Sequence, residues 1–264
     1  MGRVSKQEQK AAKKVARQAK RLAKKAEYIK IKHQWKTLPK AQRPKQFSSD
    51  FLHRWNVHEE VANSITHGIG VLLGIAALVL MIVDAASHGS VTGVVSGAVF
   101  GTSIIIAYIS SMIYHAVFYP PVKQFFKIMD HSSIFLLIAG TYTPFALITL
   151  HGALGWTLFG VAWGIATVGI ILKFSYVDDF TTLSTALYLL MGWMAAGLMV
   201  QLIQHLAFGG IVWLAIGGLC YTLGIVFFIY ERIPFFHTIW HLFVLAGTIS
   251  HFFAILLYVM PVVV

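Results

Sequence analysis

Charged residues are scarce in this chain, and their scarcity excludes most soluble folds. Asp, Glu, Lys and Arg make up 12% of the 264 residues, whereas hydrophobic residues make up 57%. A soluble domain carries about 25% charged residues, so this composition indicates a polytopic membrane protein. The apolar runs also lack the strict alternation of a transmembrane β-barrel. Each run is therefore predicted to cross the bilayer as a helix, which satisfies its own backbone hydrogen bonds.

Cysteine is almost absent as well. The single cysteine, Cys220, lies inside an apolar run, so an intramolecular disulfide is excluded. A structural zinc site rich in thiolates is excluded for the same reason. Any metal centre in this chain must therefore be built from imidazoles and carboxylates.

Long apolar runs are what the sequence does have. A transmembrane helix needs about 20 apolar residues, and seven runs meet that length. They lie at 61–83, 92–117, 132–150, 154–174, 183–206, 211–230 and 238–260. We predict an all-α membrane protein, a bundle of seven transmembrane helices, with a kink or turn at Pro144 in the third.

Basic residues predict the orientation of this bundle. Of the 21 Lys and Arg residues, 17 lie in residues 1–54. The other four are Lys123, Lys127, Lys173 and Arg232, all at one predicted face if the N-terminus is cytosolic. Because loops rich in Lys and Arg stay in the cytosol, we expect a cytosolic N-terminus, a C-terminus outside and a multi-pass protein of the cell membrane.

The chain thus divides into a basic extension, residues 1–54, and a membrane domain, residues 55–264. The extension alternates Ala, Val and Leu with Lys and Arg, a composition typical of a helix followed by a linker. We expect it to contact the anionic inner leaflet, where each basic residue contributes about 1 kcal/mol. It has few aromatics and no recognisable nucleic-acid motif, so no nucleic-acid partner is expected.

Histidines and one carboxylate gather at the predicted cytosolic face. His115 ends the second span, and Asp130 lies just before the third. His237 and His241 begin the seventh span and, being four residues apart, lie on one face of a helix. Three imidazoles are typical of catalytic zinc, which keeps a fourth position open for water. We therefore predict that His115, His237 and His241 bind Zn²⁺.

Other polar residues share that face. Ser111 lies four residues before His115, and Glu60, Asn63 and His67 form a stripe on the first span. These three are candidates to hydrogen-bond the ligand imidazoles and fix their tautomers. A single histidine inside a span more often bonds to a neighbouring helix than to a metal, which leaves a packing role open for each histidine taken alone.

Taken together, these motifs resemble a known family. They are Glu60-x-x-Asn63-x-x-x-His67, Ser111-x-x-x-His115, Asp130-His131-Ser132-Ser133, Gly140-Thr141-Tyr142-Thr143-Pro144 and His237-x-x-x-His241, with His251 downstream. The set is similar to the hemolysin III family, the bacterial branch of the progestin and adipoQ receptor family, to which the adiponectin receptors belong. The resemblance runs from about Glu60 to Met260 and leaves residues 1–54 outside.

The resemblance implies a seven-helix bundle with zinc near the inner face, held by the three histidines named above. It implies that Asp130 binds or orients the zinc water and that Ser111 lies nearby. The wider superfamily resembles alkaline ceramidases, which implies a zinc-dependent hydrolase acting on lipid amides or esters at the inner leaflet. In such chemistry Asp130 is a candidate general base, and Ser111 is a candidate donor to the oxyanion.

Two other functions stay open at this point. A non-catalytic zinc-containing sensor or regulator of membrane lipid homeostasis would use Asp130 as a fourth ligand. A pore-forming cytolysin would need a polar stripe through several spans, whereas the runs 154–174 and 211–230 carry almost no polar side chains. We therefore expect the partners of the protein to be membrane lipids.

Overall fold

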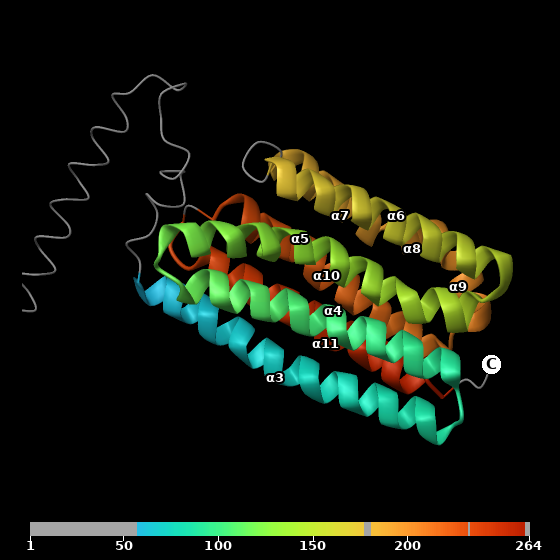
Figure 1. The fold of residues 1–264 in the computed structure, drawn as a ribbon. Coiled ribbons are helices and arrows are strands. Elements are labelled where there is room, and N and C mark those ends of the chain that lie inside the picture. Colours follow the sequence, from blue (N-terminus) through green and yellow to red (C-terminus); the bar gives the residue numbers. More distant parts are fainter. Residues whose placement is uncertain (1–56, 177–180, 232, 262–264) are drawn as a thin grey trace, which may run out of the picture. The chain divides into compact units, whose positions relative to one another are not determined.

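The computed structural model describes residues 57–176, 181–231 and 233–261, and every element in these ranges is helical (Figure 1). The elements are α3 Val57–Ser87, α4 Val91–Ala116, α5 Pro120–Pro144, η3 Phe145–Leu150, α6 Gly152–Tyr176, α7 Thr181–Gly192, α8 Met194–Gly197, α9 Met199–His205, α10 Phe208–Ile229 and α11 Phe236–Tyr258. The helix and linker expected in residues 1–54 lie outside the described residues.

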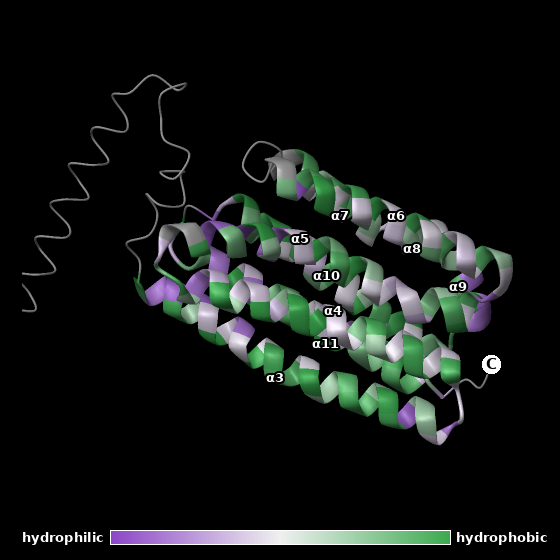
Figure 2. Cartoon of the chain, in the orientation of Figure 1, coloured by the Kyte–Doolittle hydropathy of each residue, from purple (hydrophilic) through white to green (hydrophobic). Residues whose placement is uncertain are grey.

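Six of these helices are long and apolar enough to cross a membrane, and a bent pair within α7–α9 would make a seventh span. Apolar residues run along the helices, and polar residues gather at their ends (Figure 2). Many large apolar side chains are exposed, such as Leu72 at 68% and Phe208 at 82%, as a surface in contact with lipid requires. The predicted fold class is confirmed, and the chain is a multi-pass membrane protein.

Helices α3 and α4 pack closely along a row of glycines. A Cβ atom on Gly101 would lie 2.7 Å from the Leu78 side chain, and one on Gly97 would lie 3.0 Å from that of Met81. Such small residues let two membrane helices approach each other closely. Helix α11 joins this pair in a shared core, where the Tyr108 hydroxyl of α4 donates a hydrogen bond to Thr248 Oγ1 at 2.7 Å.

The third span differs from its prediction in two ways. The apolar helix begins at Val122 rather than at residue 132, so Asp130 lies within this helix and not before it. At Pro144 the α-helix changes into the π-helix η3, because proline lacks the N–H that would continue the α-helical ladder. The bend expected at Pro144 is therefore a change in helix type.

The run 183–206 is not the single helix that the sequence predicted. It divides into α7, α8 and α9, and the segment Leu183–Gly197 is bent by 55° relative to Met199–His205. The Tyr142 hydroxyl of α5 donates to the Met191 carbonyl at 2.8 Å and accepts from the Ala195 N–H at 2.9 Å. These bonds satisfy backbone groups that the break would otherwise leave bare in the hydrocarbon.

Candidate metal centre

Three histidines from two helices meet at one end of the bundle. His115 is the penultimate residue of α4, while His237 and His241 lie in the first two turns of α11. One ring nitrogen from each lies within 4.8 Å of the other two. His115 is 4% exposed and His241 is 1% exposed. This is the one group of three or more potential metal ligands found among the described residues.

The Nδ1 atom of each of these histidines already has a partner. His115 Nδ1 lies 2.9 Å from Glu60 Oε2, and His237 Nδ1 lies 3.1 Å from Glu231 Oε2. His241 Nδ1 lies 3.3 Å from the Asn63 carbonyl oxygen. An imidazole that donates from Nδ1 presents its Nε2 lone pair to a metal. His115 Nε2 is buried and has no hydrogen-bond partner among the described residues, as a ligand atom requires.

Glu60 connects the cluster to a buried lysine. The Lys123 ammonium donates to both Glu60 carboxylate oxygens at 3.1 Å and to the Tyr114 carbonyl at 2.9 Å. This cation holds the carboxylate in place beside His115. The charge pattern of the sequence places Lys123 in a loop and indicates neither its role in this site nor that of Glu231. The one signal in the sequence is that Lys123 comes two residues after the pair Pro120-Pro121, since proline is favoured in the first turn of a helix.

Asn63 of α3 connects this helix to α11 through two hydrogen bonds. Its carbonyl contacts His241, as described above, and its side-chain oxygen accepts a hydrogen bond from Thr238 Oγ1. Thr66, one turn along α3, lies with its Oγ1 3.3 Å from His241 Nδ1. Helix α3 therefore orients two of the three histidines, His115 through Glu60 and His241 through Asn63.

His67 takes a different place from the one expected. Its ring stacks on that of His241, with centroids 3.6 Å apart and planes 8° apart, and meets the Tyr108 ring edge-on at 4.9 Å. Neither of its ring nitrogens has a hydrogen-bond partner among the described residues. His67 thus packs against a candidate ligand and does not hydrogen-bond to it.

Asp130 and Ser111 lie beside the histidines. The Asp130 carboxyl is close enough to interact with the Ser111 side chain and electrostatically with His237, Lys123 and Lys127. It does not belong to the close group of ligand atoms. Ser111 is 1% exposed and precedes His115 by one helical turn. The arrangement places a carboxylate and a hydroxyl next to a three-histidine cluster that could hold a metal ion.

A known protein family matches the part of the chain that forms this site. The family model described as haemolysin-III related matches residues 55–252. The chain belongs to this family. The match includes every candidate site residue and leaves residues 1–54 outside. The resemblance drawn from the sequence motifs is therefore confirmed.

Relatives of this chain occur in bacteria and in animals. It is 47% identical over 205 residues to Hemolysin-3 of Bacillus cereus, covering 78% of this chain and 94% of that protein. It is 45% identical over 208 residues to the Hemolysin-3 homolog of Bacillus subtilis, covering 79% and 98%. It is 30% identical over 207 residues to the monocyte to macrophage differentiation factor of Homo sapiens, covering 75% and 83%.

Other histidines of the haemolysin-III fold lie outside the cluster. His251 on α11 bonds through Nε2 to the Leu214 carbonyl of α10 at 3.2 Å. His205 bonds through Nδ1 to the Gln201 carbonyl of its own helix at 2.8 Å. These contacts have the form of helix packing and capping, the roles that intramembrane histidines most often take.

Proposed function

We propose that this haemolysin-III protein is a zinc-dependent hydrolase acting on lipid amides or esters at the inner leaflet. The observation that carries the proposal is the geometry of His115, His237 and His241. Their Nδ1 atoms are engaged by Glu60, Glu231 and Asn63, and His115 Nε2 is buried without a partner. Three imidazoles, each oriented by a contact at Nδ1, are a ligand set typical of catalytic zinc.

A zinc ion bound to these three histidines would supply Lewis-acid activation of water and of a carbonyl group. The chain's own residues supply the proton transfer. Asp130 lies beside the cluster, outside the close group of ligand atoms, where a carboxylate can accept a proton from an attacking water. The Ser111 hydroxyl is buried without a hydrogen-bond partner among the described residues, and in this proposal it donates to the oxyanion that forms on the substrate carbonyl.

The alternative is a zinc-containing sensor or regulator of membrane lipids without turnover. That function needs Asp130 as a direct fourth ligand, which closes the coordination shell. Asp130 does not join the group of close ligand atoms, and this favours the hydrolase. A pore is disfavoured because α6 and α10 carry few polar residues, so these helices offer no polar path across the bilayer.

The first test concerns the metal. Purified full-length protein should carry about one zinc per chain by elemental analysis, as a single three-histidine site implies. His115→Ala, His237→Ala and His241→Ala should each lower the occupancy sharply. His88→Ala and His151→Ala, at the far end of the bundle, are the matched controls and should keep it. Full zinc in the triple variant would disprove the ligand assignment.

The second test concerns chemistry. Asp130→Asn keeps the size and polarity of the side chain but cannot accept a proton, so turnover should fall about 10²–10⁴-fold while zinc stays bound. Ser111→Ala should lower turnover about 10²-fold. The measurement is mass spectrometry of ceramides and other lipid amides and esters incubated with the protein in bilayers. Loss of zinc from Asp130→Asn, with no turnover by the unmodified protein, would establish the regulator instead.

A further inference from the structure

Helix α11 begins after a residue with a strained backbone. Phe235, which precedes the helix, has φ 65° and ψ 1°, in the left-handed region. Residues with a Cβ atom rarely take this conformation, and for a bulky residue it is an outlier. Most helices carry Ser, Thr, Asp or Asn in extended conformation at this position, whereas the Phe235 side chain makes no capping hydrogen bond. The start of α11 therefore needs support from another part of the chain.

Glu59 of α3 supplies that support. Its carboxylate oxygen Oε1 accepts a hydrogen bond from the Phe235 N–H at 3.0 Å, although 176 positions separate the two residues. A hydrogen bond to a charged acceptor is roughly twice as strong as one between neutral groups. A carboxylate beside the N-terminus of a helix also interacts favourably with the helix dipole. The contact between Glu59 and Phe235 thus offsets the strain of the left-handed backbone.

The position of His237 depends on this first turn. His237 is the second residue of α11 and lies two positions after Phe235. The side chain of Glu231, which contacts His237 Nδ1, is 49% exposed. Exposed charged contacts of this kind stabilise a geometry only slightly. The backbone at the start of α11 is therefore the stronger constraint on where the imidazole lies.

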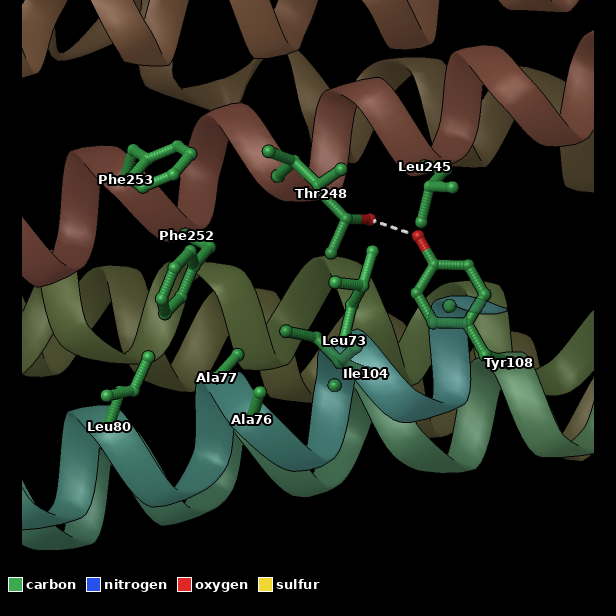
Figure 3. A pocket seen from close by; sticks show the side chains of 13 residues that line it. Leu73, Ala76, Ala77, Leu80, Ile104, Tyr108, Leu245, Thr248, Phe252 and Phe253 are labelled. Atoms are coloured by element: carbon green, nitrogen blue, oxygen red, sulfur yellow. Dashed lines mark hydrogen bonds between the residues drawn. The ribbon is translucent and has the colours of Figure 1, made fainter. Parts of the chain in front are cut away.

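Other contacts hold α11 farther along the helix. Thr238 Oγ1 donates a hydrogen bond to the side-chain oxygen of Asn63. In the apolar pocket drawn in Figure 3, the Tyr108 hydroxyl of α4 donates to Thr248 Oγ1 of α11 at 2.7 Å. Both contacts lie after His237 in the sequence, and the contact with the Phe235 N–H lies before it. His237 is thus held from both sides.

We propose that Glu59 is a positioning residue for the metal centre, acting on His237 through the Phe235 backbone. The inference deepens the proposed function and rests on it for one point, that the three histidines bind zinc. Glu59 also lies close enough to interact electrostatically with the His237 side chain. A direct effect of its charge is therefore the alternative that the experiment must separate.

This role would complete a pattern along α3. Glu60 contacts His115 at Nδ1, and the Asn63 carbonyl contacts His241 at Nδ1. With Glu59, the first two turns of α3 orient every candidate ligand, each through a different contact. The geometry of the cluster then depends on one short segment of a single helix.

Zinc-competition titrations of the purified full chain test the backbone route. Glu59→Ala should lower zinc affinity about tenfold, the lower end of the range for loss of an outer contact. Glu59→Gln keeps an acceptor oxygen without the charge, so it should lose less. Equal losses in these two variants would mean that the charge of Glu59 acts directly, and no loss in Glu59→Ala would mean that it has no role. Either result would overturn the proposal.

A second substitution provides the decisive comparison. Phe235→Gly, added to Glu59→Ala, should restore the affinity, because glycine takes the left-handed conformation without strain. Phe235→Ala, added to Glu59→Ala, is the matched control, since it removes the same ring but keeps the Cβ atom. It should not restore the affinity. Rescue by neither variant, or by both equally, would refute a role of the Phe235 backbone.

Hydrogen exchange in the metal-free protein separates this inference from the proposed function. The Ile239 N–H donates to the Phe235 carbonyl at 2.9 Å and reports on the first turn of α11. It should exchange faster in Glu59→Ala and regain protection when Phe235→Gly is added. This result, with no zinc in any variant, would remove the metal centre and keep the positioning of His237. Unchanged exchange in Glu59→Ala, with zinc bound at full affinity, would keep the metal centre and remove the role of Glu59.

Discussion

At the scale of single residues, the site depends on contacts behind the candidate ligands. The convergence of His115, His237 and His241 could be predicted, because the i, i+4 spacing and the threading of the spans both bring them to one end of the bundle. Their role as ligands stays a prediction. Lys123 and Glu231 could not be found in this way, since a charge near a loop carries the same sequence signal whether it turns inward or faces water.

Substitution of Glu60 tests how much these contacts behind the candidate ligands contribute to metal binding. Glu60→Gln removes the charge that His115 and Lys123 share but keeps the side-chain volume. The loss of such an outer contact typically lowers metal affinity about 10–100-fold, and we expect a fall in this range in a zinc-competition titration. Asp84→Asn, on the same helix at the other end of the bundle, should leave the affinity unchanged. An unaltered affinity in Glu60→Gln would mean that His115 needs no orienting carboxylate.

At the scale of helices, hydropathy located the spans but not their interruptions. The run 183–206 is apolar and has no proline, and its only local signals for a break are Gly192 and Gly197. The stabilising contact comes from Tyr142, which is distant in sequence. A break that depends on a side chain of another helix cannot be derived from the composition of the broken one.

Removing that contact should destabilise the broken span. Tyr142→Phe leaves the Met191 carbonyl and the Ala195 N–H without their hydroxyl partner. A buried polar group left unsatisfied costs about 1–3 kcal/mol, so the unfolding midpoint in a denaturing-detergent titration should fall. Tyr230→Phe, at an exposed tyrosine beyond the end of α10, is the control and should not shift it. Equal midpoints for the two variants would exclude a stabilising role for the Tyr142 hydroxyl.

At the scale of the whole molecule, the distribution of basic residues predicts how the bundle lies in the membrane. With 17 of 21 Lys and Arg residues in residues 1–54, a reporter fused before residue 1 should signal from the cytosol. A reporter fused after Val264 should signal from outside, because the sequence predicts seven spans between the ends. Signals from the same side would mean that the bent pair α7–α9 enters and leaves through one face.

The hydrogen bond between His241 and Asn63 joins residues that are 178 positions apart. Helix α3 is the first described helix to leave the ribosome, and α11 is the last. A contact of such sequence separation forms late, because the intervening chain must be in place first. The histidine cluster therefore does not exist in a nascent chain interrupted before Phe236. If the cluster binds the proposed zinc, loading of the ion would report that insertion is complete, and a partly synthesised chain would have no assembled site with which to compete for scarce metal.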